Sequence, residues 1–210
     1  MTGENAEKNE VDVTEVMQRV RLIGITGKAG SGKDTLADYI ASKYGARKMA
    51  LADPIKEILN SLFGFPASAW KDREWKEKVA PMIGHSPRVL IQSLGTQWGR
   101  MINEDLWVSK LVAKWRESDG ALTIVPDIRF DNEAVFMLRS GSMIIRIDRN
   151  EVEPVAQHES ENGVQDQLVH LTIENNGTFE DLFAAFDEAI VKHVKDTEAK
   201  MIAEQQAEQQ

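Results

Sequence analysis

The stretch from residue 21 to residue 41, RLIGITGKAGSGKDTLADYIA, restricts the possible folds of this chain more than any other. It begins with apolar, β-branched residues, which predict a short buried strand, and it ends in the spacing of an amphipathic helix. Between them stands the G-x-x-x-x-G-K pattern of a phosphate-binding loop. Glycines permit positive φ there, so successive backbone N–H groups can turn toward phosphate oxygens at the helix N-terminus.

The loop supplies most of the nucleotide-binding residues that we expect. They are Gly27, Lys28, Ala29, Gly30, Ser31, Gly32, Lys33, Asp34 and Thr35. Lys33 is expected to reach the β- and γ-phosphates as a point charge, which makes it the first catalytic candidate. A glycine-rich turn that binds no ligand, followed by an acidic first helical turn, is the structural alternative.

Asp34 occupies the position at which the motif normally has the serine or threonine that binds magnesium. A carboxylate beside phosphates is tolerable only if a cation neutralises it, so we interpret Asp34 as a Mg²⁺ ligand, either directly or through water. Thr35, the next residue, then becomes a phosphate contact.

The composition limits the classes of protein to which the chain can belong. With 210 residues, of which 42% are hydrophobic, we expect one domain with inserted lobes. A net charge of -9 argues against general binding to nucleic acids or membrane surfaces, so small substrates are expected. The absence of cysteine excludes disulfides, thiolate metal sites and a cysteine nucleophile. Neither a signal peptide nor a bilayer-spanning run is recognisable, which favours a cytoplasmic enzyme.

Strand and helix patterns alternate along the chain, which predicts an α/β fold in which helices cover a parallel sheet. Residues 1–19 are polar for the most part and are expected to form a disordered or frayed N-terminal segment. Residues 196–210 are expected to form a polar C-terminal tail. The folded domain then extends over residues 20–195.

Two proline-containing sequences mark the starts of helices. Asp53 and Pro54 follow an expected strand at residues 47–52, and they predict an N-cap and a first helical residue. A role of Asp53 in substrate binding is an equal alternative. Ser86 and Pro87 open a longer helix in the same way.

The helix that begins at Pro87 has two different faces. Its apolar face consists of Leu90, Leu94, Trp98 and Met101, and a polar stripe consists of Arg88, Gln92 and Thr96. Arg88 can bind a phosphate through both the helix dipole and its guanidinium group, which favours a ligand-facing stripe over a merely exposed one. The lysines and arginine between residues 71 and 78 are interpreted instead as a solvated face.

The apolar segment ALTIVP, residues 121–126, predicts another buried strand, and an acidic residue follows it directly. The carboxyl ends of parallel strands form the ligand crevice of such sheets, so Asp127 is predicted to organise Mg²⁺ or to act as a base. Arg129 would point into the same crevice and could hold an acceptor phosphate. A capped loop with a local Asp–Arg pair is the alternative.

Six short motifs together resemble those of the bacteriophage deoxynucleoside monophosphate kinases, a branch of the adenylate-kinase-like P-loop kinases. They are GKAGSGKDT, ADPIKE, PRVLIQSLGTQWGR, DIRFDNEA, HESE and IENNGT, and they extend over about residues 20 to 190. The resemblance implies a P-loop NTPase fold with about five parallel strands flanked by helices. It also implies an acceptor-binding helical region at residues 54–118 and a short lid at residues 150–168.

The resemblance also implies roles for individual residues. The acceptor nucleotide would contact a set consisting of Asp53, Arg88, Gln92, Thr96, Trp98, Arg129, His158 and Glu161. Within that set, His158 and Glu161 would order the lid or contact substrate, and His158 is otherwise an ordinary surface histidine. Asn176 and Gly177 would border the adenine, although a plain strand-to-helix turn explains them equally well.

The expected lid lacks the arginines that ordinary adenylate kinases place there, because no Lys or Arg occurs between residues 150 and 168. The arginine clamp must therefore come from elsewhere. Arg146 and Arg149 precede the segment, and Arg149 is the better candidate because it lies at the base of the lid. With Lys33, Asp127 and Arg129 it completes the expected catalytic set.

These observations predict a Mg²⁺- and ATP-dependent kinase that transfers the γ-phosphoryl group to a deoxynucleoside monophosphate. Its partners would be the two nucleotides, with neither nucleic acid nor membrane involved, and the resemblance makes a homodimer plausible. One alternative is a P-loop kinase for another phosphorylated metabolite, such as phosphomevalonate or dephospho-coenzyme A. A nucleotide-binding switch that hydrolyses ATP slowly or not at all is the other.

Overall fold

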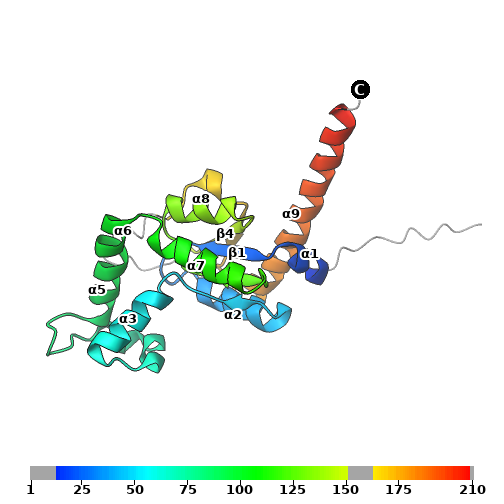
Figure 1. The fold of residues 1–210 in the computed structure, drawn as a ribbon. Coiled ribbons are helices and arrows are strands. Elements are labelled where there is room, and N and C mark those ends of the chain that lie inside the picture. Colours follow the sequence, from blue (N-terminus) through cyan, green and yellow to red (C-terminus); the bar gives the residue numbers. More distant parts are fainter. Residues whose placement is uncertain (1–12, 151–162, 209–210) are drawn as a thin grey trace, which may run out of the picture.

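The computed structural model describes residues 13–150 and 163–208 of the chain. Its centre is a five-stranded sheet in the order β2-β3-β1-β4-β5, and all neighbouring strands are parallel. The strands are β1 (Leu22–Thr26), β2 (Arg47–Lys48), β3 (Thr123–Val125), β4 (Met143–Asp148) and β5 (Leu171–Glu174). Helices flank this sheet, so the prediction of an α/β fold with about five parallel strands is confirmed (Figure 1).

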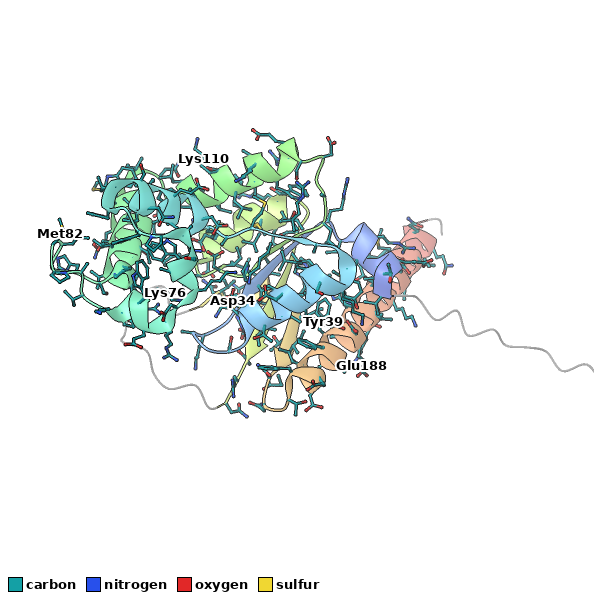
Figure 2. All side chains as sticks on the ribbon, turned by 90° about the horizontal axis from the view of Figure 1, so that it is seen from below. Asp34, Tyr39, Lys76, Met82, Lys110 and Glu188 are labelled. Carbon is teal, nitrogen blue, oxygen red and sulfur yellow. The ribbon has the colours of Figure 1, made fainter. Side chains whose placement is uncertain are left out.

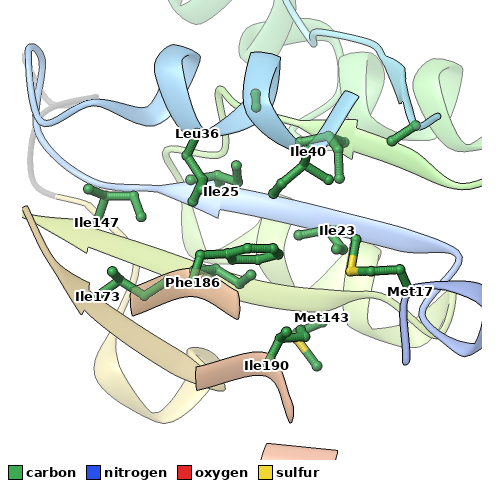
Figure 3. Packing of buried hydrophobic residues seen from close by; sticks show 14 of the residues in the cluster. Met17, Ile23, Ile25, Leu36, Ile40, Met143, Ile147, Ile173, Phe186 and Ile190 are labelled. Carbon is green, nitrogen blue, oxygen red and sulfur yellow. The ribbon is translucent and has the colours of Figure 1, made fainter. Parts of the chain in front are cut away.

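Helices on both faces bury the sheet. One face is covered by α1 (Val13–Arg19), α2 (Lys33–Tyr44) and α9 (Phe179–Glu208), and the other by α7 (Leu106–Glu117) and α8 (Asp131–Arg139). On the first face, the fully buried Phe186 belongs to the same hydrophobic cluster as Ile25 and Ile40 (Figure 3). Because both faces are covered, every residue of β1 is buried, as its continuous apolar sequence predicts.

The segment of the chain that follows β2 and precedes α7 forms a helical lobe beside the sheet (Figure 1). Its elements are α3 (Asp53–Phe63), η1 (Ala67–Lys71), α4 (Arg73–Glu77), α5 (Pro87–Gln92), the π-helix η2 (Ser93–Trp98) and α6 (Gly99–Ile102). The lobe has a small hydrophobic core of its own, in which Ile55, Leu59 and Trp70 are buried. The lobe lies on the side of the sheet opposite α1 (Figure 1).

The two ends of the domain differ from the expectation of frayed segments. Residues 13–19 form α1, whose Val16 and Met17 are fully buried. This helix has seven residues, which are too few for an apolar period to stand out in the sequence. At the other end α9 continues through the expected tail to Glu208, because Ala, Glu, Gln and Lys are strong helix formers. No helix in the described ranges is long and apolar enough to cross a membrane.

Replacement of Phe186 tests the core under α9. We expect Phe186→Ala to lower the free energy of unfolding by ~3–5 kcal/mol, because it leaves a cavity among fully buried side chains. Phe179→Ala in the same helix is the control, since Phe179 is 61% exposed and should change stability by no more than ~0.5 kcal/mol. Urea unfolding measures both values, and similar losses in the two variants would contradict the packing of α9.

Candidate phosphate-binding site

The glycine-rich loop connects β1 to α2 in the predicted order. Gly27, Gly30 and Gly32 have φ angles of 139°, 81° and 103°, values that side chains other than glycine rarely adopt. A Cβ atom on Gly27 would also collide with the carbonyl oxygen of Ile147 at the end of β4. The loop therefore needs glycine for its backbone conformation and for its close approach to the sheet.

Polar groups of the loop are arranged around its centre. Lys33 Nζ donates to the carbonyl oxygens of Gly27 and Lys28 over 2.7 and 2.6 Å, so the side chain folds back across the loop. Within the described residues, the buried hydroxyl groups of Thr26 and Ser31 have no hydrogen-bond partner. Buried hydroxyls of this kind usually have a partner, and phosphate oxygens or water in the loop would supply one.

Asn175, which sequence reasoning missed, binds the backbone of the glycine-rich loop. It follows β5, is buried, and donates from Nδ2 to the carbonyl oxygen of Ser31 over 2.8 Å. Asn176, the predicted neighbour of adenine, accepts from the backbone N–H of Asn150 over 2.9 Å, and its role at the adenine stays a prediction. Residues two apart in a strand lie on the same face, so the apolar Ile173 is the sequence signal that could have indicated an inward Asn175.

Asp34 lies in the first turn of α2, with its side chain 81% exposed. It pairs over 2.9 Å with Lys48 Nζ of β2, which also binds Asp38 over 2.9 Å. Burial acts to lower the pKa of Lys48, but the hydrogen bonds to the two carboxylates raise it more. Lys48 therefore stays charged between the two acidic side chains.

The residues near Asp34 fit a magnesium ion that binds together with phosphates. In the described residues no three His, Asp or Glu side chains gather into a group that could hold a metal ion by itself. Mg²⁺ in kinases commonly takes one or two carboxylates and completes its octahedron with phosphate oxygens and water. An exposed carboxylate one residue after Lys33 suits that mode, and Asp34 as metal ligand stays a prediction.

Asp127 is engaged by the backbone of another loop. Its Oδ1 and Oδ2 accept hydrogen bonds from the backbone N–H groups of Leu51 and Ala52 over 2.9 and 3.0 Å. Burial raises the pKa of its carboxyl group, although these two bonds and the charge of Arg129 oppose the rise. Asp127 thus connects the end of β3 to the segment between β2 and α3, which is an observed structural role beside the predicted metal or base role.

The start of α3 differs from the prediction. Ala52 is the N-cap, and Asp53 is already the first helical residue. Its Oδ2 accepts from the backbone N–H of Ala50 over 2.9 Å and its Oδ1 pairs with Lys56 over 3.1 Å. This turn also ends β2 at Lys48, so the strand expected at residues 47–52 has two residues.

The predicted long helix after Ser86 is divided. Ser86 is its N-cap as expected, with Oγ accepting from the N–H of Val89 over 3.4 Å. At Ser93 the α-helix changes into the π-helix η2, where Trp107 Nε1 donates to the carbonyl oxygen of Gly95 over 2.8 Å. A π-turn is wider than an α-turn, so the predicted stripe of residues four apart does not continue as one straight line.

The stripe residues are only partly accessible. Gln92 and Thr96 are half-buried, and Arg88 in the first turn of α5 pairs through Nε with Glu77 of α4. Trp98, predicted to contact substrate, is 45% exposed and its ring centroid lies 6.5 Å from that of Trp107. An arginine in an exposed ion pair of this kind can exchange its carboxylate for a phosphate at little cost.

The loop after β3 remains next to the phosphate loop. The backbone N–H of Ile128 donates to the carbonyl oxygen of Ile25 over 3.2 Å, which extends the contact between the two strands by one step. The positive charges of Arg129 and Lys56 both act to lower the pKa of Asp127. The structure therefore brings Asp127 and Arg129 together beside the strand that leads into Gly27.

Glu133 is a second residue that sequence reasoning missed. Its Oε2 accepts from the backbone N–H groups of Arg129 and Phe130 over 2.9 and 3.1 Å, so it fixes the loop that carries Arg129 at the start of α8. Burial raises the pKa of its carboxyl group to about 7, although both hydrogen bonds oppose the rise. A glutamate three residues into a helix is a recognisable capping signal, which could have identified it.

Two arginines precede the expected lid and have different surroundings. Arg146 donates to the carbonyl oxygen of Val164 and pairs with Asp166 of η4 (Asp166–Leu168). Both partners belong to the last residues of the expected lid, so the guanidinium group of Arg146 is already engaged within the protein. Arg149 is exposed and lines a hollow of about 290 Å³ together with Lys28, Asp148, Asn150 and Glu174. Arg149 therefore stays the better candidate for the clamp.

Part of the expected lid is attached to the domain. Val164 is buried in the core on the α7–α8 face, and the backbone N–H of Gln165 donates to Asp131 Oδ1 over 2.8 Å. A lid, if present, is therefore shorter than residues 150–168. His158 and Glu161 lie outside the described residues.

Comparison with known proteins gives a family for this chain. The family model for deoxynucleotide monophosphate kinases matches residues 21–82 and 73–186. A protein of Acanthamoeba polyphaga mimivirus, named as a candidate deoxynucleotide monophosphate kinase, is 29% identical over 181 residues, which cover 78% of this chain and 92% of the relative. The deoxynucleotide monophosphate kinase of Enterobacteria phage T4 is 27% identical in an alignment 233 positions long, which covers 79% of this chain and 96% of that protein.

Among solved structures, a dephospho-CoA kinase from Campylobacter jejuni aligns with 84% of this chain and 96% of its own, at 14% sequence identity and a TM-score of 0.43.

The two ranges matched by the family model reach together from residue 21 to residue 186, which is well over half of the 210 residues. The chain therefore belongs to the deoxynucleotide monophosphate kinase family.

Proposed function

We propose that this protein transfers the γ-phosphoryl group of ATP to a deoxynucleoside monophosphate and so forms the diphosphate. The observation that carries the proposal is the position of two loops at neighbouring strand ends, one a glycine-rich loop after β1 and the other a loop with Arg129 after β3. Membership of the family supports a deoxynucleotide acceptor.

The contribution of the chain itself would be positioning and charge neutralisation. Lys33 would exchange its two loop carbonyls for the β- and γ-phosphate oxygens of ATP. Arg88 and Arg129 would hold the acceptor phosphate from two different elements, and Arg149 would approach the phosphates from the side of Lys28. The acceptor phosphate oxygen is already ionised at neutral pH, so no dedicated general base is required.

We place Mg²⁺ beside Asp34, where the metal would neutralise charge on the β- and γ-phosphates when it is bound. The fit rests on an exposed carboxylate at the start of α2, whose present partner is a lysine that is already shared with Asp38. Asp127 would act on the metal only through water or its remaining lone pairs, because Leu51 and Ala52 already use one lone pair of each oxygen.

The named relatives come from a virus and a bacteriophage. On that ground we propose that the reaction serves DNA precursor synthesis in the cytoplasm of an infected host cell. An extract of infected cells, separated into cytoplasmic and membrane fractions and probed with an antibody against this chain, would test the location.

A panel of acceptors tests the function directly. Purified protein with ATP and Mg²⁺ should form ADP in the presence of at least one deoxynucleoside monophosphate, and Lys33→Ala should reduce that rate by ~10²-fold or more, because it removes a charge from the transferring group. Phosphomevalonate and dephospho-coenzyme A complete the panel. Turnover with either of these alone, or ATP binding without any acceptor-dependent ADP, would contradict the proposal.

Arginine-to-lysine substitutions test the placement of the acceptor. Arg88→Lys and Arg129→Lys should each weaken the use of the deoxynucleoside monophosphate by on the order of 10-fold or more, because a lysine cannot offer the planar fork of a guanidinium group. ATP affinity, measured by calorimetric titration, should stay close to that of the parent protein. Arg139→Lys at the exposed end of α8 is the control. An equal loss of ATP affinity would assign the two arginines to the donor site.

Magnesium titration separates Asp34 from Asp38, which share the contact with Lys48. Asp34→Ala should raise the Mg²⁺ concentration needed for half-maximal activity and lower the maximal rate, and Asp34→Ser should restore part of the activity. Asp38→Ala removes a comparable ion pair one helical turn away and should titrate like the parent. Identical magnesium curves for both alanine variants would show that Asp34 only balances the charge of Lys48.

A further inference from the structure

Helix α4 carries a lysine whose surroundings differ from those of its neighbours. Lys71, Arg73 and Lys78 are exposed, as the sequence predicts for a solvated face, whereas Lys76 is half-buried. The helix is fixed in the lobe by Trp75, whose ring lies edge-on to Phe65 and Trp70 at centroid distances of 5.1 and 5.2 Å. The helix that carries Lys76 is therefore fixed in the lobe, and Lys76 is less exposed than the other basic residues of the expected solvated face.

The charged groups around Lys76 come from four elements. They are Lys56 of α3, Glu77 of α4 itself, Arg88 of α5 and Asp34 in the first turn of α2. Burial and the charges of Arg88 and Lys56 lower the pKa of Lys76, against the opposing charges of Asp34 and Glu77. Figure 2 labels Lys76 and Asp34 on the facing sides of the lobe and of α2. Lys76 thus lies where the acceptor lobe faces the start of the phosphate-loop helix.

Three cations, Lys76, Lys56 and Arg88, influence one another electrostatically here, and two of them have carboxylate partners. Lys56 pairs with Asp53, and Arg88 pairs with Glu77. Among the described side chains no carboxylate lies within ion-pair distance of Lys76, although Asp34 influences it electrostatically. Like charges that converge without full compensation cost free energy, and a polyanion placed between them would relieve the cost.

Phosphoryl transfer needs positive charge at the group that moves. The sequence has no Lys or Arg between residues 150 and 168, and Arg146 is occupied by Val164 and Asp166. Lys33 approaches from the loop of the donor, and Arg88 lies on the lobe. The charged neighbours of Lys76 include both Arg88 on the lobe and Asp34, the residue after Lys33.

We propose that Lys76 contacts the phosphate chain where donor and acceptor meet, and that α4 thereby supplies to the transferring phosphoryl group a positive charge that the lid segment lacks. The proposal rests on the kinase function proposed above. It assigns to the lobe a part in the transfer itself, in addition to binding the acceptor. It also gives a reason for the half-buried state of a lysine on a short helix.

The test compares Lys76→Met with Lys78→Met, an exposed lysine two residues further along the chain. Relative to the active parent protein, Lys76→Met should lower kcat by ~10- to 10²-fold at saturating substrates. Lys76→Arg, which keeps the positive charge, should recover part of the rate. Lys78→Met should behave like the parent. A kcat for Lys76→Met within about 2-fold of the parent would overturn the proposal.

Binding measurements exclude a merely structural role. The probe is a dinucleoside pentaphosphate that joins adenosine to the deoxynucleoside that the parent accepts, and it spans both sites. Lys76→Met should weaken this probe by on the order of 10-fold or more while ATP alone binds as to the parent. Equal losses for the probe and for ATP would instead indicate a distorted phosphate loop and would overturn the proposal. Absence of turnover in the parent itself would overturn the kinase function as well.

Discussion

The parallel pairing of β1 with β3 determines where the chemistry of this protein can take place. The two strands run in register from Leu22 opposite Thr123 to Gly24 opposite Val125, so both end at the same edge of the sheet. One continues into the glycine-rich loop and the other into the loop with Arg129, and the bond between Ile128 N and Ile25 O keeps them together. The two loops are therefore already close enough for one ligand to contact both.

Several side chains that we expect to bind ligands also have partners within the protein, and these partners differ in strength. The ion pairs of Asp34 with Lys48 and of Arg88 with Glu77 involve accessible groups, for which the net contribution is ~0–1 kcal/mol or less. Phosphates and a metal ion can replace such partners. The bonds of Asp127 to the backbone of Leu51 and Ala52 are partly buried, and a buried N–H left without an acceptor costs about 1–3 kcal/mol. Asp127 is therefore better understood first as the support of the loop before α3.

The sequence predicted those parts of the site that depend on local spacing. The glycines of the loop, the helix that begins at Lys33 and the Ser86 cap all follow from neighbours within a few residues, and the structure confirms them. The partners of Asn175 and the charged neighbours of Lys76 could not be predicted in the same way, because they lie 144 residues away in the first case and on other helices in the second. The π-helix at Ser93 accepts a hydrogen bond from Trp107 of another helix, and no periodicity of its own residues indicates it.

The central proposal is that the γ-phosphoryl group passes directly from ATP held at the glycine-rich loop to an acceptor whose phosphate is held at the loop with Arg129. The stereochemistry at the γ-phosphorus tests it most directly. ATP made chiral at that atom with sulfur and oxygen isotopes is turned over with a deoxynucleoside monophosphate, and the configuration of the product is determined. Direct in-line transfer between the two loops predicts inversion. Retention would require two successive transfers through a phosphorylated side chain and would contradict the account.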